Sequence, residues 1–95
     1  MAKILVLDGD SAAALAITRS AGRAGHEVAV GAHRGAFAAA QLSRYCRARL
    51  EYPLATEAAR EFVEVVLRYV RDHPVDLVIP VTDRTLGPLS KYREQ

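Results

Sequence analysis

The chain alternates between short runs of apolar residues and longer segments in which apolar residues recur every three or four positions. Three nearly continuous apolar runs are Lys3 to Leu7 (KILVL), Glu27 to Ala32 (EVAVGA) and Val75 to Val81 (VDLVIPV). Such runs are typical of strands in a parallel sheet, where both faces are covered. A further short strand at the edge of the sheet is expected between Tyr45 and Tyr52.

The segment from Ala12 to Ala24 has the spacing of a helix. Its small apolar residues fall on one face, which would let the helix sit close to the sheet. Ser11 is a suitable N-cap residue, and Gly25 suits the position just past the helix end. Between two strands, such a helix predicts a right-handed βαβ unit.

The clearest helix is expected from Thr56 to His73, with Thr56 as its N-cap and Pro74 helping to end it. Its apolar residues form one stripe: Ala59, Phe62, Val63, Val66, Leu67 and Val70. A last helix should begin at Thr82 or Asp83 and run to Arg93, with Pro88 within its first turns.

This order of elements predicts an α/β fold, with a small doubly wound parallel sheet of about four strands flanked by helices. Ninety-five residues are enough for one domain, here residues 1–95. Ligands of such sheets bind beyond the carboxyl ends of the strands. Two loops lie there, Gly9-Asp10-Ser11 after the first strand and Thr82-Asp83 after the last.

Composition narrows the possible partners. The formal net charge is only +2, which gives no argument for nucleic acid. Arg44, Arg47 and Arg49 form the one basic cluster, which is either a solvated strand entrance or a contact for an anion or partner. The single cysteine, Cys46, fits a reducing cytoplasm. Apolar stretches stay well below the roughly 20 residues of a membrane helix, so no membrane association is expected.

The loop after the first strand lacks the features of a nucleotide site. The dinucleotide fingerprint needs three glycines, and only Gly9 is present. Ser11 places a side chain where a pyrophosphate would approach the backbone, and Asp8 and Asp10 would repel it. The sequence also lacks a phosphate loop, a nucleophile elbow and histidines at metal-ligand spacing. We therefore expect no catalytic, cofactor or metal residues in this chain.

Three segments together resemble the N-terminal domain of ATP-grasp ligases, also called the pre-ATP-grasp domain. They are KILVLDGDSAAALAITRSAGRAGHEVAV at the start, SRYCRARLEYP from Ser43 to Pro53, and DLVIPVTDRT from Asp76 to Thr85. The resemblance spans nearly the whole chain. The relatives it suggests are proteins like the carbamoyl phosphate synthetase large subunit and other carboxylate–amine ligases.

The resemblance implies a role as part of an enzyme. In that family the complete ligase activates a carboxylate with ATP as an acyl phosphate, which an amine then attacks. ATP and magnesium are held by later domains, and the N-terminal domain helps to form the acceptor-substrate pocket. The implied partners are a small amine or amino-acid-like substrate and ATP-grasp domains in cis or in trans. This chain has no residues that match the nucleotide and metal sites, so it should not be catalytic alone.

The resemblance carries a substrate-binding role to Gly9, Asp10, Ser11, Thr82 and Asp83. Their carboxylates and hydroxyls can accept or donate hydrogen bonds to an amine. A purely structural interpretation stays open, in which Ser11, Thr82 and Asp83 are only helix caps. Two other functions also stay open: a free-standing Rossmann-like binding or interaction module, and a nucleotide-cofactor domain.

Overall fold

The computed structural model describes residues 1–93, which form four strands, three α-helices and one short 3₁₀ helix. In chain order these are β1 (Lys3–Val6), α1 (Ala12–Arg23), β2 (Glu27–His33), η1 (Ala39–Leu42), β3 (Cys46–Tyr52), α2 (Ala59–Asp72), β4 (Leu77–Ile79) and α3 (Asp83–Arg93). The strands are all parallel and lie in the order β3-β2-β1-β4. The structure confirms the α/β fold with a doubly wound parallel sheet.

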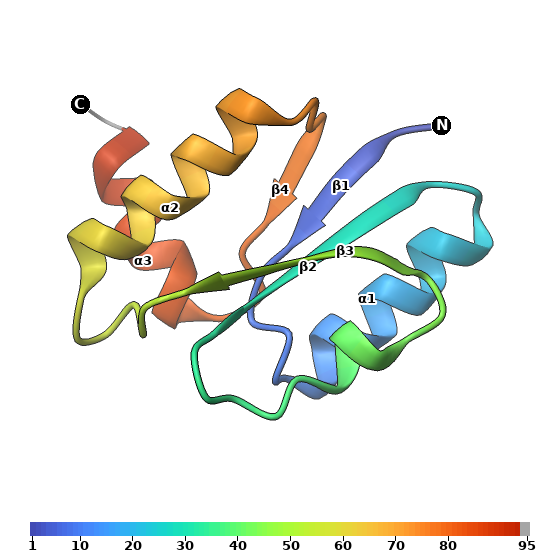
Figure 1. The fold of residues 1–95 in the computed structure, drawn as a ribbon, viewed down its shortest axis with the longest axis horizontal. Coiled ribbons are helices and arrows are strands. Elements are labelled where there is room, and N and C mark those ends of the chain that lie inside the picture. Colours follow the sequence, from blue (N-terminus) through green and yellow to red (C-terminus); the bar gives the residue numbers. More distant parts are fainter. Residues whose placement is uncertain (94–95) are drawn as a thin grey trace.

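The helices cover the two faces of the sheet, as Figure 1 shows. α1 and η1 lie on one face, and α2 and α3 lie on the other. The alternation of β1 explains the two cores, since side chains along a strand point to opposite faces in turn. Leu5 and Leu7 pack beneath α2, whereas Ile4 and Val6 pack beneath α1.

The two covering layers differ in the size of their side chains. α1 approaches the sheet through small residues such as Ala14, which is fully buried. Gly22 of the same helix lies so close to the ring of Tyr45 that a Cβ atom there would overlap it. On the other face, α2 inserts Phe62, Val63 and Val66 into the core, where Phe62 meets Tyr52 edge to face at 4.7 Å between ring centroids. Of the predicted stripe of α2, these three residues are buried and Val70 is partly buried, whereas Ala59 and Leu67 are exposed.

Two predicted boundaries are wrong. α2 begins at Ala59, and its cap position is Ala58, which makes no side-chain cap hydrogen bond, so Thr56 is not the N-cap. The reason is a turn before the helix, in which the amides of Glu57 and Ala58 both donate to Leu54 O. β4 covers only Leu77–Ile79 rather than seven residues.

Candidate functional site

The carboxyl ends of β1 and β4 lie side by side at the point where the sheet reverses its strand order. From β1 the chain proceeds through β2 to β3 on one side, and it returns to place β4 on the other side of β1. Loops that follow these two strands diverge to opposite faces of the sheet, into α1 and α3. Ligands of open α/β sheets bind at such a switch point. Both loops predicted from the sequence lie here.

Asp8 occupies the centre of this region. It has a left-handed backbone, with φ of 59°, and is only 2% exposed. Its Oδ2 accepts hydrogen bonds from the backbone N of Thr82 at 2.9 Å and from Oγ1 of Thr85 at 2.6 Å. Its own amide donates to the hydroxyl of Tyr52 at 3.0 Å, which in turn donates to Gly31 O. Asp8 therefore ties the ends of β1, β3 and β4 together.

Arg84, in the first turn of α3, joins Asp8 to Asp10. Its Nη2 lies 3.4 Å from Oδ1 of Asp8 and 3.0 Å from Oδ1 of Asp10. The Oγ1 of Thr82 accepts from both the amide and the Nε of Arg84, at 3.3 and 3.4 Å. The hydrogen bond to Asp10 raises the pKa of the Arg84 guanidinium further, although partial burial opposes this. The arginine is thus held in one orientation by three neighbours.

Asp10 forms the accessible side of the cluster. Its side chain is 23% exposed, and its Oδ2 lies 3.6 Å from Nε2 of His33 at the end of β2. Partial burial raises the pKa of Asp10, but the hydrogen bond and positive charge of Arg84 outweigh it and leave the pKa below its usual value. Asp10 is therefore a carboxylate at neutral pH.

Gly9 and Ser11 shape the loop between β1 and α1. A Cβ atom on Gly9 would lie 2.8 Å from Cγ1 of Val30, while the amide of Gly9 donates to Gly31 O at 2.9 Å. This position therefore requires glycine because its backbone lies directly against β2. Ser11 is the N-cap of α1: its Oγ accepts from the amide of Ala14 at 3.1 Å and donates to Asp8 O at 2.8 Å.

The structure brings only some of the predicted residues together. Asp10 and Thr82 meet through Arg84, and Gly9 and Ser11 hold the backbone beneath them. Asp83 is exposed at the first residue of α3, and no hydrogen bond links its side chain to the cluster within residues 1–93.

Sequence reasoning missed four members of the cluster: Asp8, His33, Arg84 and Thr85. A signal was present in the spacing of D-x-D at 8–10 and T-x-R-T at 82–85, directly after two strands that prove adjacent. Opposite charges that follow neighbouring parallel strands meet at the same sheet edge. That pairing becomes visible only once the strand order is known.

The arrangement leaves an excess of negative charge. Two carboxylates share one guanidinium, and the side chains of Asp10, His33 and Arg84 remain 23%, 25% and 34% exposed. Such a site favours a small cation over an anion. Within residues 1–93 no group of three or more His, Cys, Asp or Glu side chains is placed to hold a metal ion. No helix in that range is long and apolar enough to cross a bilayer.

Comparisons with known proteins give no family model, no curated protein and no solved structure that matches this chain.

Proposed function

We propose that this chain is the substrate-side, N-terminal domain of an ATP-dependent carboxylate–amine ligase of the ATP-grasp type. The observation that carries the proposal is the polar cluster at the switch point of the sheet, in which Asp8, Asp10, Thr82 and Arg84 are joined by His33 and Thr85. In an open α/β sheet this is the place where a small ligand is expected. In this role the domain recognises the acceptor substrate and does not catalyse alone.

The charge of the cluster suits an amine. Two carboxylates share the single guanidinium of Arg84, so the pair keeps a net negative charge, and Asp10 is its accessible member. An ammonium group there would gain a charge-assisted hydrogen bond. Arg84 is one-third exposed and can meet a carboxylate on the same ligand. An amino-acid-like substrate, with both groups, therefore matches the site better than a simple amine.

The same geometry argues against nucleotide binding at this edge. The N-terminal turn of α1 would be the place for a phosphate. Here the amide of Ala14 is already bonded to Ser11, and Asp8 and Asp10 precede the helix. ATP and magnesium would instead be held by the other domains of the ligase, in cis or in trans.

An interaction module is the second candidate, and a specific observation favours it. Beside β4 lies an apolar groove of about 270 Å³ between α2 and α3, with Leu67 and Leu86 about half exposed on its walls. The groove suits contact with a neighbouring protein domain, because exposed apolar patches commonly mark protein contacts. Such a contact is also compatible with a ligase domain.

Ligand binding to the chain tests the proposal directly. In two-dimensional amide NMR spectra, L-alanine should shift the amides of Asp10, Ser11, Thr82 and Arg84, and Asp10→Asn should abolish these shifts. Asp83→Asn is the matched control, since Asp83 lies outside the cluster and should leave the shifts in place. Sub-micromolar binding of Mg-ATP, measured by calorimetry, would contradict the proposal and favour a nucleotide-cofactor domain.

The ligase role itself is tested with the ATP-grasp domains present. Asp10→Asn should raise the Michaelis constant for the acceptor and leave that for ATP unchanged. A hydrogen bond to a charged group contributes about 1.5–3 kcal/mol, which corresponds to roughly tenfold or more. Unchanged acceptor kinetics would limit Asp10 to a structural role.

A further inference from the structure

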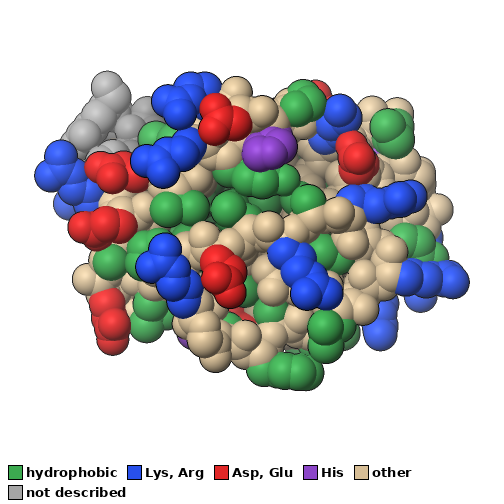
Figure 2. All heavy atoms as spheres, in the orientation of Figure 1, with side chains coloured by type: hydrophobic (Ala, Val, Ile, Leu, Met, Phe, Trp, Pro, Cys, Tyr) green, Lys and Arg blue, Asp and Glu red, His purple; other side chains and the backbone are tan. Residues whose placement is uncertain are grey.

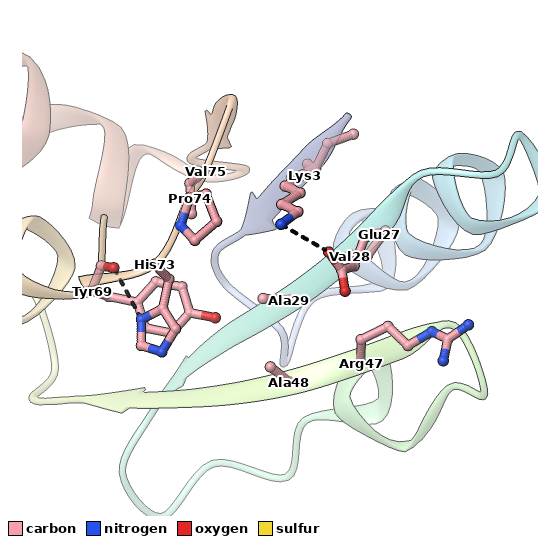
Figure 3. A pocket seen from close by; sticks show the side chains of 11 residues that line it. Lys3, Glu27, Val28, Ala29, Arg47, Ala48, Tyr69, His73, Pro74 and Val75 are labelled. Carbon is pink, nitrogen blue, oxygen red and sulfur yellow. Dashed lines mark hydrogen bonds and ion pairs between the residues drawn. The ribbon is translucent and has the colours of Figure 1, made fainter. Parts of the chain in front are cut away.

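A pocket lies at the opposite, amino-terminal edge of the sheet. Its volume is about 230 Å³, and it is bounded by the starts of β1, β2 and β3 and by the end of α2 with the loop that follows (Figure 3). This volume is below the roughly 300–1,000 Å³ of pockets for drug-sized ligands. The pocket therefore suits a ligand of about one ring.

The hollow exists because two adjacent strands carry alanine at paired positions of the sheet. Ala29 of β2 and Ala48 of β3 are register partners, and both line the pocket. α2 ends at Asp72, and Tyr69 is the one residue of this helix that lines the pocket beside these alanines. The floor is therefore apolar and flat.

An aromatic pair forms one wall. The rings of Tyr69 and His73 are stacked, with centroids 4.2 Å apart and planes at 20°. Nδ1 of His73 lies 3.2 Å from Tyr69 O, which fixes the imidazole against the helix end. Figure 3 shows the hydroxyl of Tyr69 directed over the floor of the pocket. A planar ring between this wall and the alanine floor would make apolar contact on both sides.

The rim of the pocket is predominantly basic. Lys3 forms a long ion pair with Glu27, with Nζ and Oε2 3.9 Å apart. Arg47 also lines the pocket, and no ion pair of its guanidinium occurs within residues 1–93. In Figure 3 it extends from β3 away from the aromatic wall. There it borders a neighbouring hollow of about 420 Å³ that Arg44 also lines. Three cations thus face one carboxylate across the two hollows.

We propose that this amino-terminal edge binds an aromatic anion, with its ring between the aromatic wall and the alanine floor and its acid group at Arg47. A short flexible linker must join the two parts, because Arg47 points away from the ring site. The site is separate from the polar cluster at the carboxyl edge. The inference therefore stands or fails independently of the ligase proposal.

The test uses three probes of matched shape with the complete chain. 4-Phenylbutyrate carries the ring, the linker and the anion; 4-phenylbutylamine reverses the charge; 4-cyclohexylbutyrate removes the planar ring. Amide NMR titration with 4-phenylbutyrate should shift Ala29, Ala48 and His73 in a saturable way. Both other probes should bind at least about fivefold more weakly, as expected for the loss of one partly exposed ion pair or one ring contact.

Two arginines of one strand provide the matched variants. Arg47→Gln should weaken 4-phenylbutyrate binding about fivefold, whereas Arg49→Gln should leave it within about twofold. Arg49 is also exposed on β3 and lines neither hollow. Ala48→Leu should weaken binding at least about tenfold by filling the ring site. Ala48 is exposed, so the fold should tolerate the change.

Three results would overturn the inference: no saturable shifts at these amides, equal binding of the amine, or equal effects of the two arginine variants. Retained amide dispersion in each variant shows that a loss of binding does not come from unfolding.

Discussion

The two edges of the sheet differ in how their side chains are bonded and buried. At the carboxyl edge, side chains from the loops after β1 and β4 bond to one another, with the buried Asp8 at the centre. At the amino edge the first strand is tied by the amide of Asp76 donating to Lys3 O and by the carboxylate of Asp76 accepting from the Lys3 amide. Beside that tie, two alanines leave a hollow. The carboxyl edge is thus held by buried polar side chains, whereas the polar side chains of the amino edge lie at the surface.

The difference also concerns what each edge can recognise. The carboxyl edge has more carboxylates than cations, whereas the amino edge has more cations than carboxylates. Figure 2 shows basic side chains distributed over one face of the molecule with acidic ones between them. The two local excesses therefore come from the residues at each edge and are not visible in the small net charge of +2.

The largest expected effect on stability comes from α2, whose two ends should differ in how much their aromatic side chains stabilise the fold. Phe62 is fully buried against Tyr52 near the carboxyl edge, while Tyr69 is only partly buried at the amino-edge pocket. Phe62→Ala should lower the free energy of unfolding by about 3–5 kcal/mol, and Tyr69→Ala by under about 2 kcal/mol. Urea denaturation followed by circular dichroism measures both. Similar losses would mean that the two ends of the helix are packed equally.

The next effect concerns the polar centre of the carboxyl edge. Asp8→Asn removes the charge that pairs with Arg84 but keeps a residue that tolerates the left-handed backbone at this position. We expect a loss of about 2–3 kcal/mol, because the buried carboxylate accepts hydrogen bonds from Thr82 and Thr85 as well. Denaturant melts of the variant and the parent chain measure it. A loss below about 0.5 kcal/mol would show that the amide replaces the carboxylate fully.

A pH titration should reveal a smaller contribution from Asp10. Its pKa is lowered in the folded chain, so its ionised form stabilises the fold at neutral pH, and this stabilisation is lost as the pH falls through the folded pKa. The stability difference between the parent chain and Asp10→Asn should be constant above about pH 5 and should shrink below about pH 4. Melting temperatures from pH 2 to 7 test this. A difference that grows in acid would contradict the direction of the shift.

The smallest effect is expected at Asp83. Asp83→Asn should change the free energy of unfolding by no more than about 0.5 kcal/mol, because the side chain is exposed and lies outside the cluster. The same denaturant melts apply. A loss equal to that of Asp8→Asn would place Asp83 in the network after all, in a cap of α3.

The sequence predicted helices and strands well where a single local feature, such as an apolar run or an N-cap residue, determines the element. The apolar run KILVL and the serine that follows it led to β1 and the N-cap of α1, and both are present. The prediction that Thr56 caps α2 was wrong, because the turn in which Glu57 and Ala58 donate to Leu54 O precedes the helix and no side chain caps it. The buried pairing of Asp8 with Thr85 could not be predicted, since it joins residues 77 positions apart and depends on which strands are neighbours.

The hydrogen bonds from Thr82 and Thr85 to Asp8 also bear on the order of folding. They connect the first strand with the last helix, so almost the whole chain lies within the loop that they close. Contacts of such sequence separation carry a high entropic cost and tend to form late. A variant at Asp8 should therefore accelerate unfolding and leave the refolding rate nearly unchanged, as stopped-flow kinetics can establish. The N- and C-terminal parts of the domain would then be separated first whenever the native state opens.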